Sequence, residues 1–381
     1  MKLIARTFAG LEPLLADELS KLGAKDITIQ KRAVSFEGDK FIMYKVNMLS
    51  RLSLDVLTPI KSFNANDPDA LYDQVKKIDW SEYMDETDTF SLSSIIYSSV
   101  FTHSQFAVLK AKDAIVDQFR EKTGTRPDIE KYTPDLRIVL RINEQKCELL
   151  LNSSGAPLFK RGYRQRTGEA PLNEVLAASI VMFTDWNKKT PFIDPMCGSG
   201  TICIEAGMIA RNIAPCLTGR DYGFEKWKGF DVNLFNEIYD QAEDDIVENR
   251  VIIKGYDVDM DVLSAARGNL KALPMLTSNI TFEKSDFMNS EKSFEKGILV
   301  FNPPYDKRIT VYNVDEFYEK IGGILKHKYN GYDAWMFSGN LDALKKVGLK
   351  PKRKIPLFNG PEECRLVHYP LYIGTKRYGE S

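Results

Sequence analysis

Two short stretches carry residues whose types and spacing could perform chemistry. The first, residues 192–206, reads FIDPMCGSGTICIEA: an apolar step, an acid, a Gly-x-Gly turn and an apolar run with helical character. This order predicts a strand, a tight loop and a helix. Gly198 and Gly200 let the backbone turn sharply and approach a ligand closely, and Thr201 is expected to cap the helix. Exposed N–H groups at such a helix start attract a carboxylate or a phosphate.

The second stretch, residues 297–305, reads GILVFNPPY. Residues 298–301 form a short apolar run typical of a buried parallel strand. The run ends in Asn302, Pro303, Pro304 and Tyr305, where two prolines force a rigid bend because they cannot continue a strand. The bend offers a side-chain amide, a carbonyl outside any strand ladder and an aromatic ring. A structural turn explains the tetrapeptide equally well, but its position downstream of the glycine loop favours a chemical role.

Together, DPMCGSGT and NPPY resemble the class I S-adenosylmethionine-dependent methyltransferases that modify exocyclic amino groups of nucleobases. The glycine spacing is not that of the G-x-G-x-x-G dinucleotide fingerprint. The resemblance implies that the Asn302 side-chain oxygen and the Pro303 carbonyl accept N–H bonds from a base, while Tyr305 stacks on it. The implied cofactor-binding residues are Asp194, Met196, Gly198, Ser199, Gly200, Thr201, Asp257, Asp286 and Asn302.

Three downstream acids compete for cofactor roles. The run 251–256 reads as a strand ending at Asp257, and a carboxylate at a strand end can accept both hydroxyls of a ribose. Asp259 is the alternative, but we expect it to cap a helix over residues 261–273. In the resembled family an acid at the position of Asp286 faces the adenine amino group. A lone Asp in a loop is otherwise a common turn former.

Two basic clusters are candidates for contacts with nucleic acid. Residues 159–167, FKRGYRQRT, carry four cations with no acid before Glu169, and residues 350–354 read KPKRK. Either cluster could instead be a solvated turn. An aromatic side chain among arginines can stack on an unpaired base. The predicted RNA-binding residues are Lys160, Arg161, Tyr163, Arg164 and Arg166, with Lys307 and Arg308 beyond the bend.

The chain divides by pattern into four parts. Residues 1–64 alternate short strands and helices, as in a ferredoxin-like α+β layer. Residues 65–155 contain a helix at 104–122, with Phe106, Leu109, Val116 and Phe119 at helical spacing, and a strand at 136–142. Ahead of LFKRGYR, this part looks like a THUMP RNA-binding domain. Residues 156–170 form a basic linker. Residues 171–381 alternate strands and helices, predicting a Rossmann-like, doubly wound α/β sheet with an antiparallel edge.

Over nearly its whole length the chain resembles the bacterial 23S ribosomal RNA guanine-N2 methyltransferases and their single-module relatives. S-adenosylmethionine is then the cofactor, RNA the partner, and a guanine nucleotide a weak occupant of the base pocket. A THUMP-bearing tRNA guanine-N2 methyltransferase stays open. So do a DNA adenine-N6 methyltransferase, which would extrude its base, and a non-catalytic RNA-binding assembly factor.

Composition sets the remaining limits. The chain has 381 residues and a formal net charge of −1, so any nucleic-acid footprint must be local. Residues 1–23 contain no long apolar run, and we expect neither a signal peptide nor a membrane span. The five cysteines lack C-x-x-C spacing, which supports no disulfide framework and no zinc site. We expect a cytoplasmic protein without a metal, and Cys197 and Cys203 as buried, inert thiols.

Overall fold

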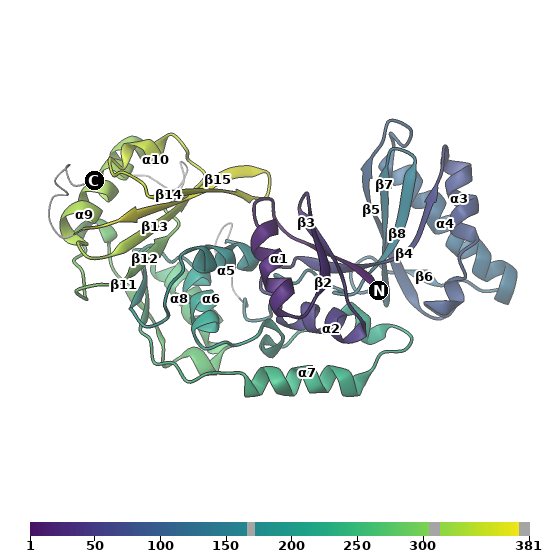
Figure 1. Cartoon of the computed structure of the whole chain (residues 1–381), viewed down its shortest axis with the longest axis horizontal. Helices are drawn as coiled ribbons and strands as arrows, with labels where there is room; N and C mark the ends of the chain where they lie inside the picture. Colours follow the sequence, from purple (N-terminus) through teal and green to yellow (C-terminus); the bar gives the residue numbers. More distant parts are fainter. Residues whose placement is uncertain (166–171, 305–312, 373–381) are drawn as a thin grey trace. The chain divides into compact units, whose positions relative to one another are not determined.

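The computed structural model describes residues 1–165, 172–304 and 313–372, and it divides into two compact units (Figure 1). The first unit comprises Met1–Thr7, Leu15–Leu158 and Arg220–Asp240. The second comprises Phe8–Leu14, Phe159–Gly219 and the described chain from Gln241 onward. Each unit is built on one sheet.

The sheet of the first unit has the strand order β2-β3-β1-β4-β8-β7-β5-β6. Its first four strands follow a β-α-β-β-α-β order along the chain, as the ferredoxin-like prediction requires. The sequence analysis missed β4, which joins this part to the next by pairing with both β1 and β8. Pro59 interrupts its ladder, and the register shifts there. The strands are β1 (Lys2–Arg6), β2 (Lys25–Gln30), β3 (Ala33–Glu37), β4 (Asp55–Asn64), β5 (Thr89–Tyr97), β6 (Asp128–Ile129), β7 (Leu136–Asn143) and β8 (Lys146–Asn152).

Helices of the first unit begin and end at residues that the sequence marks. Asp39 caps α2 (Lys40–Leu49), and Asp67 caps α3 (Pro68–Lys76). Gly124, with φ 77°, ends α4 (Ser104–Thr123). The apolar face expected for α4 is partly wrong: Val116 and Phe119 are buried as predicted, but Phe106 and Leu109 are exposed. The other buried apolar residues of the helix are Ala107, Ala111, Ala114 and Ile115. Most of α1 (Glu12–Lys21) also belongs to this unit.

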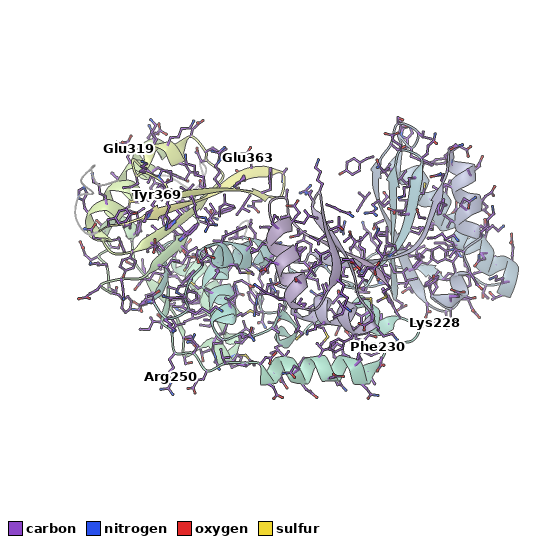
Figure 2. All side chains as sticks on the ribbon, in the orientation of Figure 1. Lys228, Phe230, Arg250, Glu319, Glu363 and Tyr369 are labelled. Carbon is purple, nitrogen blue, oxygen red and sulfur yellow. The ribbon has the colours of Figure 1, made fainter. Side chains whose placement is uncertain are left out.

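A segment from the second half of the sequence, Arg220–Asp240, packs within the first unit. The ring of Phe224 stacks on Tyr44 with centroids 4.1 Å apart, and Phe230 lies 5.9 Å from the same tyrosine. Lys228, labelled with Phe230 in Figure 2, forms an ion pair of 2.6 Å with Asp85. An aromatic cluster therefore attaches to the first unit a stretch that the sequence pattern placed in the 171–381 part. The helix α7 (Val232–Asp244) begins in this stretch.

The second unit contains a seven-stranded sheet in the order β11-β10-β9-β12-β13-β15-β14. The first five strands are parallel, and β15 and β14 pair antiparallel at one edge. The prediction of a doubly wound sheet with an antiparallel edge is confirmed. The strands are β9 (Phe192–Asp194), β10 (Ile253–Asp257), β11 (Ile280–Lys284), β12 (Ile298–Phe301), β13 (Asp333–Ser338), β14 (Arg353–Asn359) and β15 (Glu362–Pro370).

Helices cover both faces of this sheet. Successive strand residues point to opposite faces: Ile193 joins a buried cluster with α9 (Val314–Lys328), whereas the ring of Phe192 packs on Trp186, just after α5 (Glu174–Phe183). The other helices of the unit are α6 (Thr201–Ala210), α8 (Met260–Lys271) and α10 (Ala343–Lys346). Short 3₁₀ turns occur at Trp80–Glu82, Pro215–Thr218, Gly223–Lys226, Pro274–Leu276 and Phe287–Asn289.

Two predicted absences can be compared with the described residues. No helix among them is long and apolar enough to cross a bilayer. Within the same ranges no group of three or more metal-ligating side chains comes together. All five cysteines are free and buried, including Cys197 and Cys203.

Candidate active site

The strands of the two stretches, β9 and β12, end at the same side of the sheet in the second unit. Strands β9 and β12 are parallel neighbours, with Ile298 opposite Phe192 and Leu299 opposite Ile193. The loop after β9 carries Gly198, and Asn302 follows β12 directly. Because both strands run in the same direction, their carboxyl ends share one edge, where ligands bind in open α/β sheets.

Close packing explains the second glycine of the loop. Gly200 has φ 79°, and an added Cβ would lie 2.5 Å from Cζ of Phe282. Phe282 is equally close to a Cβ built on Gly255 of β10, also at 2.5 Å. One buried ring therefore requires glycine on both neighbouring segments, since ordinary Cβ contacts are much longer.

The first glycine of the loop, Gly198, has no such close packing around it among the described residues. Gly198 has φ 52°, but no described atom lies within 4 Å of an added Cβ, so its surface is open. Its N–H donates to Oδ2 of Asp257 at 2.9 Å, and the Cys197 N–H donates to the Tyr256 carbonyl at 2.8 Å. The strand end of β10 thus fixes the loop while leaving one side of it open.

The downstream acids also hold backbone. Asp257 accepts the Asp259 N–H at 3.0 Å through Oδ1, and Asp259 caps α8 by accepting from Asp261 at 2.8 Å, as expected. Asp286 follows β11, where it accepts from the Met288 N–H at 2.9 Å and from the Asn289 side chain at 2.7 Å. The turn-forming interpretation of Asp286 therefore holds in this structure. Its contact with an adenine stays a prediction, as does that of Asp257 with a ribose.

Asp194 is a buried acid at the end of β9. Asp194 is only 1 % exposed, and its Oδ1 accepts the Met196 N–H at 3.1 Å. Burial raises the pKa of this carboxyl well above its usual range, and the nearby carboxylate of Asp257 raises it further. Burial likewise raises the pKa of the Cys197 and Cys203 thiols, which makes them poor nucleophiles.

Thr201 does not cap α6. The cap is Gly200, without a side-chain bond, and Thr201 is already the first helical residue. Its hydroxyl instead accepts from Nη2 of Arg164 at 3.1 Å. Arg164 also donates to the Leu172 carbonyl at 2.8 Å and pairs with Glu174 at 2.7 Å. This arginine was predicted to bind RNA, but its side chain is 12 % exposed and is occupied in holding the start of α6.

Two further RNA-binding predictions are wrong for the same reason. Arg161 and Tyr163 are each 1 % exposed, which leaves neither able to contact a phosphate or a base. Both meet Glu205 of α6: Nε of Arg161 lies 3.1 Å from Oε1, and the Tyr163 hydroxyl donates to the same oxygen at 2.9 Å. A buried carboxylate needs such partners. Lys160 is exposed, so its predicted RNA contact stays a prediction.

Asn269 was not predicted as a functional residue, but it connects Gln165 of the basic linker to the glycine loop. Its Nδ2 donates to the Ser199 carbonyl at 3.2 Å, and its Oδ1 accepts the Gln165 N–H at 3.0 Å. Asn269 is 1 % exposed on α8. A signal existed, because Asn269 follows Ala265 and Ala266 at the helical spacing of the apolar face. Glu205, an acid within the apolar run of α6, gave a similar signal.

The bend after β12 is only partly described. All four residues of β12 are buried, Pro303 is buried, and Asn302 is half-buried at the strand end. The strand therefore brings the amide to the same edge as Asp194. Tyr305, Lys307, Arg308 and Arg166, which the sequence analysis assigned to base stacking and RNA contacts, lie outside the described residues.

The residues at this edge suit a nucleoside cofactor. No described atom fills the space that a Cβ on Gly198 would occupy, and the acids Asp194 and Asp257 lie at the ends of the adjacent strands β9 and β10. Carboxylates suit ribose hydroxyls and a cationic group. A doubly wound sheet with an antiparallel edge, a glycine loop after β9 and an Asn-Pro-Pro bend after its parallel neighbour β12 define a class I S-adenosylmethionine-dependent methyltransferase.

Comparisons with known families agree with this class. Residues 161–368 match UPF0020, an RMKL-like methyltransferase domain, residues 65–152 match the THUMP domain, and residues 2–57 match the RlmL ferredoxin-like domain. The chain belongs to the RMKL-like methyltransferase family.

Relatives of two different lengths match the chain. A Synechocystis protein named "Putative RNA methyltransferase slr0064" is 37 % identical over 95 % of both chains. The ribosomal RNA large subunit methyltransferase K/L of Syntrophotalea carbinolica is 36 % identical over 97 % of this chain and 54 % of that protein. The chain thus spans about half the length of the K/L relatives it matches.

Solved structures extend the likeness over both units. A "possible methylase" from Clostridium difficile 630 has 30 % identity and a TM-score of 0.87, covering 99 % of each chain. The protein SMU.472, solved in complex with SAH, has 26 % identity and a TM-score of 0.86, covering 98 % of this chain and 99 % of that one. SAH is S-adenosylmethionine after loss of its methyl group, which agrees with S-adenosylmethionine as the cofactor.

Proposed function

We propose that this protein transfers a methyl group from S-adenosylmethionine to the exocyclic N2 amine of a guanine in structured RNA, namely the large-subunit ribosomal RNA. The observation that carries the proposal is the parallel pairing of β9 with β12, which brings the glycine loop and Asn302 to one edge. Support for RNA comes from the THUMP match and from the named activity of the K/L relatives. Such a substrate would place the protein in the cytoplasm.

Positioning is the main contribution of the chain to this reaction. The lone pair of a guanine amine is delocalised into the ring, so the nitrogen is a poor nucleophile. Accepting its two N–H bonds at the Asn302 side-chain oxygen and the Pro303 carbonyl would orient the nitrogen and increase its electron density as the new bond forms. S-adenosylmethionine supplies an activated methyl group. The amine then loses a proton to solvent, so no general base is needed.

The site proposal assigns the cofactor to the residues of the glycine loop and the adjacent acids. Gly198 would allow close approach, while Asp257 would bind the ribose with the oxygen lone pairs that its backbone contacts leave unused. Asp194, which is buried and accepts the Met196 N–H, would contribute by fixing the backbone at the start of the loop. Met196, Ser199, Gly200, Thr201 and Asp286 complete the proposed set.

Methyl transfer to rRNA with identification of the product tests the proposal. The purified chain, labelled S-adenosylmethionine and large-subunit rRNA from a strain lacking this gene are incubated together, and the RNA is digested for nucleoside mass spectrometry. We expect N2-methylguanosine. Label only in transfer RNA would favour the tRNA alternative, and no label in any RNA would overturn the proposal.

A second candidate is a DNA adenine-N6 methyltransferase. A Listeria monocytogenes structure described as a predicted N6-adenine-specific DNA methylase has 28 % identity and a TM-score of 0.85 over 97 % of this chain. An adenine N6 amine could use the same two acceptors. The same assay with duplex DNA decides between them, because N6-methyladenine in DNA without any RNA product would favour this candidate.

A further inference from the structure

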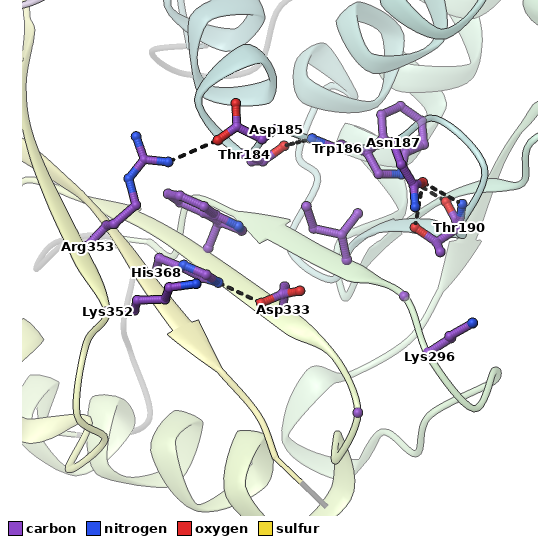
Figure 3. A pocket seen from close by; sticks show the side chains of 14 residues that line it. Thr184, Asp185, Trp186, Asn187, Thr190, Lys296, Asp333, Lys352, Arg353 and His368 are labelled. Atoms are coloured by element: carbon purple, nitrogen blue, oxygen red, sulfur yellow. Dashed lines mark hydrogen bonds and ion pairs between the residues drawn. The ribbon is translucent and has the colours of Figure 1, made fainter. Parts of the chain in front are cut away.

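A second site lies where the parallel strands of the seven-stranded sheet begin, opposite to the strand ends that carry the candidate active site (Figure 3). It is a pocket of about 360 Å³ whose lining includes Ile298 and Asp333, the first residues of β12 and β13. Because the glycine loop and Asn302 follow the carboxyl ends of the strands, this pocket is separate from the candidate active site. All of its lining belongs to the second unit.

One wall of the pocket is a fixed stack of rings. Trp335 and His368 are cross-strand partners on β13 and β15, with ring centroids 4.2 Å apart and planes within 1°. Nε2 of His368 lies 2.7 Å from Oδ1 of Asp333. The guanidinium of Arg353 lies 5.6 Å from the Trp335 ring on β13 and pairs with Asp185 at 3.1 Å. Figure 3 shows both polar pairs, one reaching from Arg353 to Asp185 after α5 and the other joining His368 to Asp333.

These contacts leave an excess of positive charge. The pocket's two carboxylates, on Asp185 and Asp333, are each engaged by a neighbouring side chain. Lys296 and Lys352 also line the pocket, are exposed, and form no ion pair among the described residues. Figure 3 shows Lys296 and Lys352 on different sides of the pocket, and positive charge on more than one side of a pocket favours a bound anion.

The positive charge continues beyond the pocket. Lys352 and Arg353 belong to the basic run KPKRK, whose other cations, Lys350 and Lys354, are exposed on either side of them. Lys188 and Lys189 are exposed directly after the lining residue Asn187. A single small anion would use only the pocket, whereas a chain of phosphates would also use this surround.

We propose that this pocket binds a phosphodiester group of the RNA, with the neighbouring lysines contacting the phosphates on either side. The inference rests on the proposed RNA substrate. A volume of about 360 Å³ is sufficient for a phosphate with its sugar. Thr184, Asn187 and Thr190 provide further polar groups. The indole of Trp335 is already stacked on His368, and the Arg353 guanidinium lies 5.6 Å from its ring centroid. Phosphate contact rather than base stacking is therefore what this pocket offers.

The experiment measures RNA affinity against salt concentration for the full chain and the double variant Lys296→Ala/Lys352→Ala. An in vitro transcript of large-subunit rRNA is the probe. Removing two phosphate contacts should reduce the slope of log affinity against log salt by about 1.5, since each contact contributes roughly 0.7 to 0.9. Lys271→Ala is the matched control: it removes an exposed lysine of the same unit outside the pocket and should leave the slope nearly unchanged.

S-adenosylmethionine binding by calorimetry verifies that the double variant is folded, because neither lysine belongs to the proposed cofactor site. A flatter slope in the double variant but not in the control supports the proposal, and an unchanged slope overturns it. Adenosine monophosphate is titrated in parallel. Its loss of binding in the double variant, with an unchanged RNA slope, would assign the pocket to free nucleotides and overturn the RNA assignment. Absence of methyl transfer by the unaltered chain would count against the proposed function alone.

Discussion

The seven-stranded sheet has a carboxyl edge, where its parallel strands end, and an amino edge, where they begin. These two edges hold their polar groups in different ways. At the carboxyl edge, buried side chains such as Asp194 and Asn269 bond to backbone, and Phe282 leaves room only for glycine at position 200. At the amino edge, Lys296 and Lys352 are exposed lining residues of a pocket that also contains a stack of rings.

This difference matches the two kinds of ligand proposed. A cofactor that must present one methyl group needs a backbone fixed to within fractions of an ångström. A polyanion needs only positive charge at roughly the right spacing, which mobile lysines provide. Substitutions at the carboxyl edge should therefore alter geometry-dependent steps, whereas those at the amino edge should alter salt-dependent affinity.

The largest effect should come from Asn302→Ala. Losing one acceptor for the base amine should lower the rate of methyl transfer at least about 100-fold, by analogy with the loss of a single transition-state hydrogen bond. Cofactor affinity measured by calorimetry should change little. Asn359→Ala, at the last residue of β14, is the control and should keep full activity. Unimpaired transfer by the Asn302 variant would remove the catalytic assignment.

Gly200→Ala should rank second. The new Cβ would meet Phe282 at 2.5 Å in a left-handed conformation, so we expect cofactor affinity to fall about tenfold or more and stability to fall by about 2 kcal/mol or more. Gly323→Ala in α9 is a matched control, because no atom of the residues that the structure describes lies within 4 Å of its added Cβ. That variant should gain roughly 0.5–1 kcal/mol from helix propensity. Equal cofactor affinity in both variants would refute the fixed-loop account.

Asn269→Ala tests whether the contacts of Asn269 with the basic linker position the glycine loop. It leaves the Gln165 N–H and the Ser199 carbonyl without their partner, and we expect a loss of about 1–3 kcal/mol in stability with a several-fold loss of cofactor affinity. Asn279→Ala is the comparison, since Asn279 is 5 % exposed and donates to the carbonyls of Asn249 and Val251. Its stability loss should be similar without any change in cofactor affinity. Equal cofactor losses would make the effect of Asn269 merely structural.

The smallest effect should be the pH response of Asp194→Asn. Because the pKa of Asp194 is raised in the folded protein, the unfolded chain releases this proton first, and the native protein loses stability as pH rises above the ordinary aspartate pKa of about 4. The asparagine variant lacks this loss. Its melting temperature relative to the unaltered chain should therefore increase from about pH 5 to about pH 8. Asp244→Asn, at an exposed helical position, should show no such trend.

Local sequence determined most of the elements and the edge at which the site lies. Apolar runs, glycines and helix caps such as Asp67 and Asp259 act over a few residues, so they can be interpreted without knowledge of distant contacts. The alternation of strands and helices then requires parallel pairing, and parallel pairing brings the ends of β9 and β12 together.

Only the tertiary structure decided which polar residues are exposed. The cluster KRGYR has the composition of an RNA-binding turn, yet Arg161 and Tyr163 are buried against Glu205, and Arg164 holds Thr201. The basic run at 350–354 has a similar composition but remains at the surface. Composition gives the charge of a segment. Whether a charged side chain is buried depends on whether a distant segment supplies a compensating carboxylate. Only the folded chain brings those segments together.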